Sequence, residues 1–282
     1  MTLRETRIGR FRVVALHDAD FALDGGAMFG VVPRALWERL TPVNEDHTIP
    51  LASTPFLLDD GEHRILIEPG MGKRWGEKKV KMFHIDHSDG HELLTSLRAA
   101  GVEPEQITHC LMSHCHWDHI GAVCGEDGQP VFPNAEHWCP DSEKEALLSQ
   151  DHLRRASYRV EDLQPVIDAG LLQTFHGSAE ILPGISMVEL GGHSDGIALI
   201  LVDSEGQKGA FWADVVPTRN HVHLPFIMAY DMNAERSFAV RSAWISHAAA
   251  EGWTNMLYHD TVSPLGRFTF DGRKYAFEAL EA

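Results

Sequence analysis

Apolar runs and helical periodicities alternate along the chain and predict a layered α/β protein. An apolar run at Ile107–Met112 enters a polar stretch and indicates a buried strand that presents side chains at its carboxyl end. Just before it, Leu93, Leu94 and Leu97 share one face of a helix expected over Gly90–Ala100. Alternating strands and helices are typical of α/β architecture, in which ligands bind at the carboxyl ends of strands.

The same patterning predicts the remaining elements. A hairpin is expected from Pro55–Asp59 and His63–Glu68, which flank a cluster of turn-forming residues. The other expected elements are strands at Arg7–His17, Ile185–Leu190, Ala198–Asp203, Gly209–Ala213 and, as the last strand, Asn255–Tyr258; helices at Asp141–Gln150, Val160–Ala169 and Asn233–Glu251; a loop with a short helix at Leu23–Leu40; and a polar surface excursion at Lys73–His91. No linker or internal repeat interrupts this order, so one domain over residues 1–282 is expected.

Charge and composition exclude several classes of partner. Lysine and arginine number 24 against 41 acidic residues, which gives a formal net charge of −17. No nucleic acid or anionic membrane is expected to bind, because phosphate neutralisation needs clustered basic residues. No apolar run approaches the roughly 18 residues that cross a bilayer, and the N-terminal sequence is too charged for a secretory signal, so a cytoplasmic protein is expected. The 4 cysteines form no C-x-x-C pair and are expected to be free thiols.

Metal-binding side chains crowd the stretch that follows the central strand. His114, His116, Asp118 and His119 lie within six positions. On extended backbone, residues two apart point the same way, so His114 and His116 can grip one metal ion together. Asp118 and His119, one turn onward, are placed to grip a second ion beside it. Cys115 should point away into the fold, where a structural thiol is expected.

Three more polar residues follow later strands of the predicted sheet. His193 comes after Ile185–Leu190, Asp214 comes after Gly209–Ala213, and His259 comes directly after the strand expected last. In a layered sheet these strand ends share one rim. Together with the first four residues they provide five histidines and two aspartates, which is enough for two metal ions with positions left for water and substrate. The histidines of the polar excursion (His84, His87 and His91) are sparse, and no metal role is expected for them.

The residues of the motif match the H-x-H-x-D-H signature of the metallo-β-lactamase superfamily, and the chain resembles that family from the Phe56–Gly70 hairpin through His259. The resemblance implies a four-layer αββα sandwich with two divalent metal ions between the sheet edges, and zinc is the expected ion. It also implies a ligand set: His114, His116 and His193 for the first ion; Asp118, His119 and His259 for the second; and Asp214 as a bridge between them.

The chemistry implied by the resemblance is hydrolysis. A hydroxide that bridges two cations attacks a carbonyl carbon, and Asp118 orients this hydroxide or relays a proton to the leaving group. Glu68 is a candidate for orienting a ligand histidine, although relatives more often carry aspartate at the end of that strand.

Two further stretches, Gly25–Leu40 and Ala213–Met232, are similar to the quorum-quenching lactonase and methyl parathion hydrolase branch of the family. They are expected to line the substrate groove with an apolar wall, and core packing is the alternative for each residue. The candidates are Met28, Phe29, His221, Phe226, Met228 and Tyr230. Several lactonases of this branch place a catalytic tyrosine where this chain has Pro217, and Tyr230 is the candidate replacement.

A hydrolase of lactones or related esters, acting on a small-molecule substrate, is therefore the leading hypothesis. The alternative enzyme is a hydrolase of phosphotriesters or aryl esters, which metal-dependent turnover of paraoxon-type substrates would distinguish. A catalytically silent metal-binding module is a third reading, favoured by fewer than about two ions per chain. Relatives in this branch are often homodimers, and the aromatic residues near Phe29 and Trp37, which are expected to be exposed, permit that state.

Overall fold

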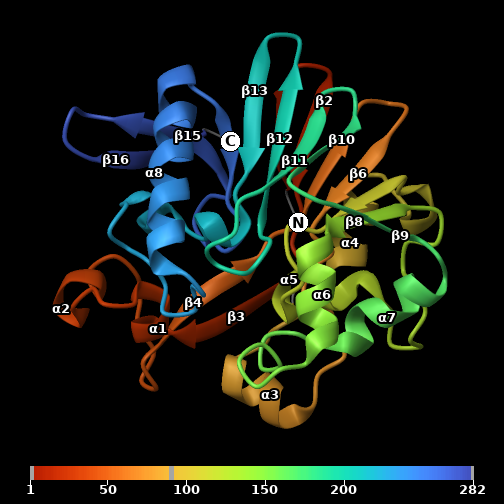
Figure 1. The fold of residues 1–282 in the computed structure, drawn as a ribbon, viewed down its shortest axis with the longest axis horizontal. Helices are drawn as coiled ribbons and strands as arrows, with labels where there is room; N and C mark the ends of the chain where they lie inside the picture. Colours follow the sequence, from red (N-terminus) through yellow and green to blue (C-terminus); the bar gives the residue numbers. More distant parts are fainter. Residues whose placement is uncertain (1–2, 89–91, 281–282) are drawn as a thin grey trace.

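The computed structural model describes residues 3–88 and 92–280 and has two seven-stranded sheets packed face to face (Figure 1). The first sheet has the order β1 (Arg4–Ile8), β2 (Phe11–Ala15), β5 (Phe56–Asp59), β6 (Arg64–Ile67), β7 (His109–Leu111), β8 (Glu136–Pro140) and β9 (Leu172–Phe175). The second has the order β10 (Ser178–Leu182), β11 (Ile185–Glu189), β12 (Ala198–Ser204), β13 (Gln207–Phe211), β14 (Thr254–Met256), β15 (Leu265–Phe270) and β16 (Tyr275–Ala279).

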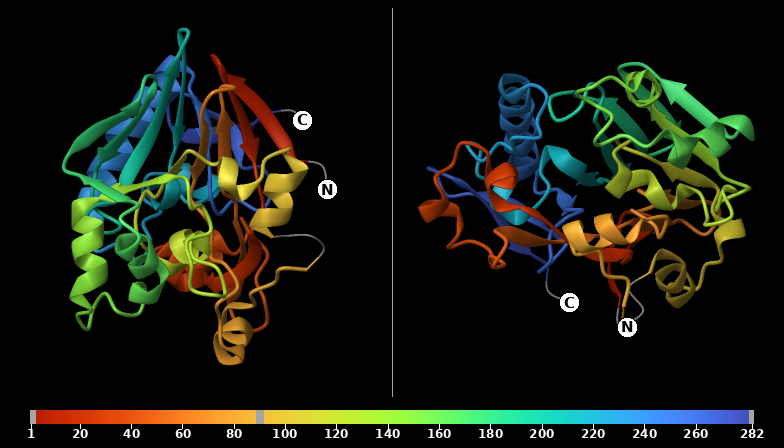
Figure 2. Two further views of the ribbon diagram at one scale, coloured as in Figure 1. Left: turned by 90° about the vertical axis from the view of Figure 1, so that its right-hand side faces the viewer. Right: turned by 90° about the horizontal axis from the view of Figure 1, so that it is seen from below.

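Helices cover the outer face of each sheet, which gives the expected four-layer αββα sandwich (Figure 2). Helices α4 (Leu93–Ala99), α6 (Asp141–Ser149) and α7 (Val160–Asp168) pack on the first sheet through one apolar cluster. Helix α8 (Ala234–Glu251) packs on the second sheet. The largest core cluster lies between the sheets, where the Phe56 and Phe211 rings meet edge to face at 5.7 Å. This burial of apolar area is what holds the two halves together.

A smaller layer closes one end of the sandwich. Strands β3 (Ala19–Asp24) and β4 (Thr48–Ser53) form an antiparallel pair, and the short helices α1 (Gly25–Phe29), α2 (Arg34–Trp37) and α3 (Glu77–Phe83) accompany it. These elements lie below the two sheets in Figure 1 and share a third apolar cluster. They face the end of the sandwich at which β7, β13 and β14 terminate.

Several expected elements differ from the structure. The strand expected at Arg7–His17 is interrupted, because Gly9 adopts a left-handed φ of 55° and turns β1 back on β2. The loop at Leu23–Leu40 contains two short helices rather than one, and the excursion at Lys73–His91 contains α3. The strand at β14 is not the last, since β15 and β16 extend the sheet beyond it.

The other expected elements are confirmed to within two residues at each described end: the β5–β6 hairpin, strands β7, β11, β12 and β13, and helices α6, α7 and α8. The first two residues of the helix expected at Gly90–Ala100, which are Gly90 and His91, lie outside the described residues. No helix in the described part of the chain is both long and apolar enough to cross a membrane. The 4 cysteines are free thiols, as expected.

Candidate metal centre

The histidine-rich motif folds as a tight connection between β7 and the short helix α5 (Trp117–Ile120). His116 occupies the position that caps the helix, and Asp118 and His119 lie in its single turn. Strand β7 pairs in parallel with both β6 and β8, so its carboxyl end lies at the edge where those strands also end. This connection therefore presents four ligand-type side chains at the end of a buried strand.

Three residues from the second sheet meet this motif. His193 lies in the connection between β11 and β12, and Asp214 lies in a single 3₁₀ turn (Ala213–Val215) that follows β13. His259 follows β14, which is parallel to β13, so Asp214 and His259 leave the sheet at the same edge. The structure thus brings together all seven residues that the sequence singled out as candidate ligands.

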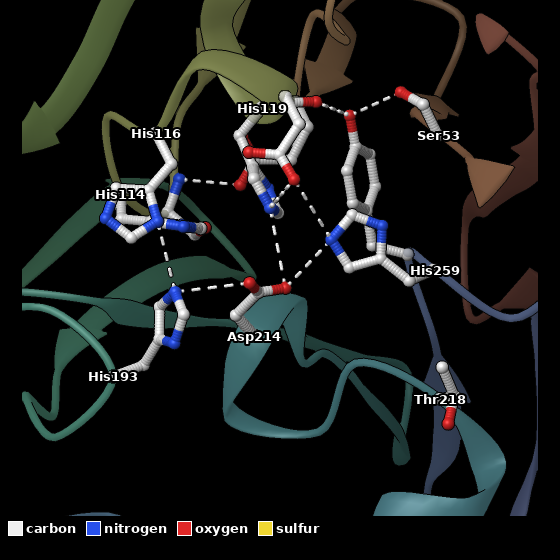
Figure 3. Close-up of polar contacts among 12 residues, drawn as sticks. Ser53, His114, His116, His119, His193, Asp214, Thr218 and His259 are labelled. Atoms are coloured by element: carbon white, nitrogen blue, oxygen red, sulfur yellow. Dashed lines mark hydrogen bonds and ion pairs between the residues drawn. The ribbon is translucent and has the colours of Figure 1, made fainter. Parts of the chain in front are cut away.

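The carboxylate of Asp214 stands at the middle of the cluster (Figure 3). Its Oδ2 lies 3.2 Å from His193 Nε2, while its Oδ1 lies 3.1 Å from His259 Nε2 and 3.4 Å from His119 Nε2. Glu68, His114 and His119 offer ligand atoms within 4.8 Å of one another. So do two groups made only of expected ligands: His114, His116, His193 and Asp214; and Asp118, His119 and His259. One carboxylate therefore reaches both groups, as a bridging ligand would.

Unsatisfied polar atoms at the centre fit bound cations. His114 Nε2, His119 Nε2 and Asp214 Oδ1 are buried and make no hydrogen bond. Burial lowers the pKa of His114 well below its usual value, and the neighbouring imidazoles add to this effect, so His114 is neutral. Burial also opposes a charge on His119, yet Asp214 and Asp118 raise its pKa well above the usual range. The carboxylates thus favour a positive charge at this position, and a bound metal ion would supply that charge.

Hydrogen bonds from the outer ring nitrogens orient two of the imidazoles. His259 Nδ1 donates to the carbonyl oxygen of Ala52 at 2.9 Å, and His193 Nδ1 donates to Asp231 Oδ1, also at 2.9 Å. Each bond fixes the tautomer and leaves the Nε2 lone pair directed at the centre. Asp231 lies in a loop and belongs to no periodic pattern, so the sequence carries no signal for its role.

Glu68 and Tyr258 support the second group of ligands. Glu68 is fully buried; its Oε1 accepts the Ser113 amide at 2.8 Å, and its Oε2 lies 3.8 Å from His119 Nδ1. The Tyr258 ring stacks on His119 with centroids 4.3 Å apart, and its hydroxyl donates to the Asp118 carbonyl oxygen at 2.7 Å. The sequence marks Glu68 as a candidate, whereas it places Tyr258 only at the end of an expected strand.

A cavity of about 190 Å³ opens onto the centre. Its floor includes polar groups of the cluster, and its walls are apolar, formed by Leu23, Met28, Phe83 and Trp117. Tyr230 also lines it and is 40% exposed. Burial of the hydroxyl, together with the charges of Asp24 and Asp118, raises the pKa of Tyr230 to about 12, so the phenol is a hydrogen-bond donor at neutral pH.

Four of the six expected groove residues do not line this cavity, which corrects that part of the expectation. Phe29 and His221 are each 1% exposed and stack on one another with centroids 5.0 Å apart. Phe226 and Met228 pack into the same apolar cluster. These side chains support the wall from behind, because the loop after Asp214 folds its large residues inward against α1.

His84, His87 and Cys115 lie outside the metal-type groups. His84 pairs with Asp46 at 2.7 Å, and His87 contacts the carbonyl oxygens of Asp18 and Gly72. Neither belongs to a metal-type group among the described residues. Cys115 is fully buried in the apolar cluster beneath α4, α6 and α7, and its contact with Cys139 and burial raise the pKa of its thiol well above the usual value. Among the described residues, Cys115 also belongs to none of the metal-type groups.

The chain belongs to the metallo-beta-lactamase superfamily, whose model matches residues 48–261. An N-acyl homoserine lactonase of Bacillus cereus is 27% identical over 160 residues, which cover 53% of this chain and 58% of that relative. A probable metal-dependent hydrolase from Staphylococcus aureus superposes with a TM-score of 0.91 at 27% identity, over 98% of this chain and 99% of that one. AidC, a dizinc quorum-quenching lactonase in complex with a product, superposes with a TM-score of 0.80 at 20% identity, over 99% and 98% of the two chains.

Proposed function

We propose that this chain is a metal-dependent hydrolase that binds two divalent ions, with zinc as the native metal, and cleaves lactones or related esters. The observation that carries the proposal is the position of Asp214, whose two oxygens face histidines of both ligand groups. A single ion would need only one of these groups, so the shared carboxylate favours two ions.

The proposed ligands of the first ion are His114, His116 and His193, and those of the second are Asp118, His119 and His259, with Asp214 shared. When bound, two such ions polarise the substrate's oxygen and lower the pKa of a bound water from 15.7 to about 7.

The chain's own residues orient the substrate and move protons. The carboxylate of Asp118 borders the cavity and lies 3.6 Å from His259 through its Oδ2, so it can receive a proton and pass it to a leaving oxygen. The Tyr230 hydroxyl is a donor that can hold an oxygen of the substrate. Leu23, Met28, Phe83 and Trp117 keep water away from the apolar part of the substrate.

The substrate class rests on two supports. The Bacillus cereus relative is named as an N-acyl homoserine lactonase, and it is 27% identical to this chain over 160 residues. The cavity has apolar walls above a polar floor, which suits an uncharged ester with an aliphatic or aromatic part. A neutral carbonyl compound fits these walls better than a polyanion.

The direct test is metal removal and resupply on the purified chain. The metal-free protein is expected to be inactive and to regain lactone or aryl-ester hydrolysis as Zn²⁺ approaches two ions per chain. Asp214→Asn should lose this activity, whereas Asp203→Asn, at an exposed position of β12, should keep it. No metal-dependent turnover on a panel of lactones and aryl esters would overturn the substrate class. Faster turnover of paraoxon-type phosphotriesters would replace it with the alternative.

A further inference from the structure

Glu143 is a fully buried carboxylate in the first turn of α6. Its Oε2 accepts hydrogen bonds from the Cys115 amide and the Tyr158 hydroxyl, both at 3.0 Å. Its Oε1 accepts the Gly196 amide at 2.8 Å. All three donors are neutral, so the carboxylate is held by directed hydrogen bonds rather than by an opposite charge.

Each of these partners adjoins a candidate ligand of the first ion. Cys115 lies between His114 and His116 in the motif, and Gly196 lies three residues after His193. The Tyr158 ring packs edge to face on His116 with centroids 4.8 Å apart. Glu143 therefore joins three segments that are far apart in sequence and that carry or contact all three histidines of the group.

The loop that carries His193 comes unusually close to α6. A Cβ added to Gly196 would lie 1.9 Å from Ser142 Oγ and 3.1 Å from Ser142 Cβ, so any larger residue would force side chains at this contact to move. The Ser142 hydroxyl in turn donates to Glu189, at the end of β11. The first turn of α6 thus binds this loop on both sides of His193, through Ser142 before it and Glu143 after it. Of these two residues, Glu143 is the one that also contacts the metal motif.

We propose that Glu143 is a positioning residue for the first metal ion, setting the separation of the His114–His116 backbone from the His193 loop. This inference rests on the proposed function, because it needs the two-ion centre to exist. The Cys115 amide lies directly between two ligands of the first ion, whereas the second-ion ligands Asp118 and His119 lie three and four residues beyond it, in α5. Loss of one acceptor oxygen should therefore weaken binding of the first ion more than binding of the second.

The test is stepwise metal binding by the full-length variant Glu143→Gln, which keeps the shape of the side chain but replaces one acceptor oxygen with an NH₂ group. Competition with a chromogenic chelator should show one Zn²⁺ step weakened about tenfold or more, and the other step weakened by a clearly smaller factor. The absorption spectrum of the Co²⁺-loaded protein should change for the same ion. Glu145→Gln, an exposed position on the same helix, makes the same charge change and should alter neither step.

Tyr158→Phe provides a second variant, since it removes a single donor to Oε2 and should weaken the same step by a smaller factor. If circular dichroism shows that Glu143→Gln does not fold, Tyr158→Phe replaces it in the metal-binding measurements. Unchanged Zn²⁺ affinities and Co²⁺ spectra in the folded variants, even with a lower Tm, would assign Glu143 a purely structural role and overturn the inference alone. A wild-type chain that binds no pair of ions would overturn the proposed function, and this inference with it.

Discussion

Asp231 accepts a 2.9 Å hydrogen bond from Nδ1 of His193, and both side chains are only 3% exposed. The amide of Met232 also donates to the carbonyl oxygen of His193, at 3.1 Å. Tyr230, which lines the cavity, immediately precedes this pair. The loop that shapes the substrate pocket is therefore the same loop that fixes a candidate ligand of the first ion.

Removal of the Asp231 carboxylate should weaken metal binding. In Asp231→Ala, His193 loses the acceptor that fixes its tautomer and ring orientation, so affinity for one Zn²⁺ should fall by about 10–100-fold. Asp231→Asn keeps an acceptor oxygen and should show a smaller loss. Chelator competition measures both, and Asp203→Ala, on an exposed position, is the matched control. Equal affinity in all four proteins would mean that His193 needs no carboxylate partner.

Tyr230→Phe tests the donor in the pocket. Because the pKa of Tyr230 is raised to about 12, the lost group is a neutral hydroxyl that can bond a substrate oxygen. We expect kcat/KM for the preferred ester to fall about tenfold or more, with unchanged metal content and Tm. The half-buried Tyr275 of β16 lies in a different part of the fold, and Tyr275→Phe should leave turnover intact. Full activity in Tyr230→Phe would limit Tyr230 to forming the wall.

Arg241 should control the shape of the pocket loop. This α8 residue is 2% exposed, and its guanidinium donates to the carbonyl oxygens of Phe226, at 2.6 Å, and of His221 and His223. Burial lowers its pKa to about 10. Arg241→Met leaves these carbonyls without their donor, so the free energy of unfolding should drop by about 2–3 kcal/mol and KM should rise.

Urea denaturation and steady-state kinetics check the Arg241 prediction, with Arg267→Met at an exposed position as the control. Loss of stability without any change in KM would show that the pocket loop keeps its shape without this anchor.

His137 should make the fold sensitive to mild acid. Burial lowers its pKa from 6.5 to about 4, although its hydrogen bond to the Ala135 carbonyl oxygen opposes the shift. The unfolded chain takes up a proton near pH 6.5 and the folded chain does not until about pH 4. Stability from this residue is therefore complete above pH 6.5 and is lost as the pH falls toward 4, by up to about 3 kcal/mol.

The comparison that isolates this effect is His137→Gln against the wild type, with chelator present in both so that the metal centre does not contribute. The difference in urea unfolding free energy should shrink between pH 7 and pH 4. His152→Gln, at an exposed position, should give a constant difference. A pH-independent difference for His137→Gln as well would mean that His137 takes up its proton at the same pH in the folded and unfolded chains.

The candidate ligands could be found from sequence because their signal is local. Each ligand follows an apolar run that predicts a strand. Strand ends at the same edge of a sheet lie close together, whatever the details of side-chain packing. His193 and His259 needed only the positions of β11 and β14, which the sequence placed to within two residues. A dense motif and a set of strand ends thus predict a centre without knowledge of the side-chain contacts.

The pocket residues and the β3–β4 pair could not be found from the sequence pattern. Phe29 ends the short helix α1 and Tyr230 lies in a loop, and only the tertiary packing of that loop against α1 separates a buried ring from a pocket residue. Strand β4 contains Pro50, a residue type disfavoured inside strands, yet this strand lies in a two-stranded pair where a missing amide donor is tolerated. Asp231 and Glu143 act through contacts between segments far apart in the chain.

Each ligand group draws on both sheets: the motif after β7 belongs to the first, whereas His193, Asp214 and His259 belong to the second. Bound ions would therefore cross-link the two halves of the sandwich across their interface, and removal of the ions would remove this cross-link. The resistance of the whole fold to heat, denaturant or proteolysis would then depend on the free metal concentration around it, rising logarithmically above the dissociation constant. In a metal-starved environment the same chain would lose activity and durability together.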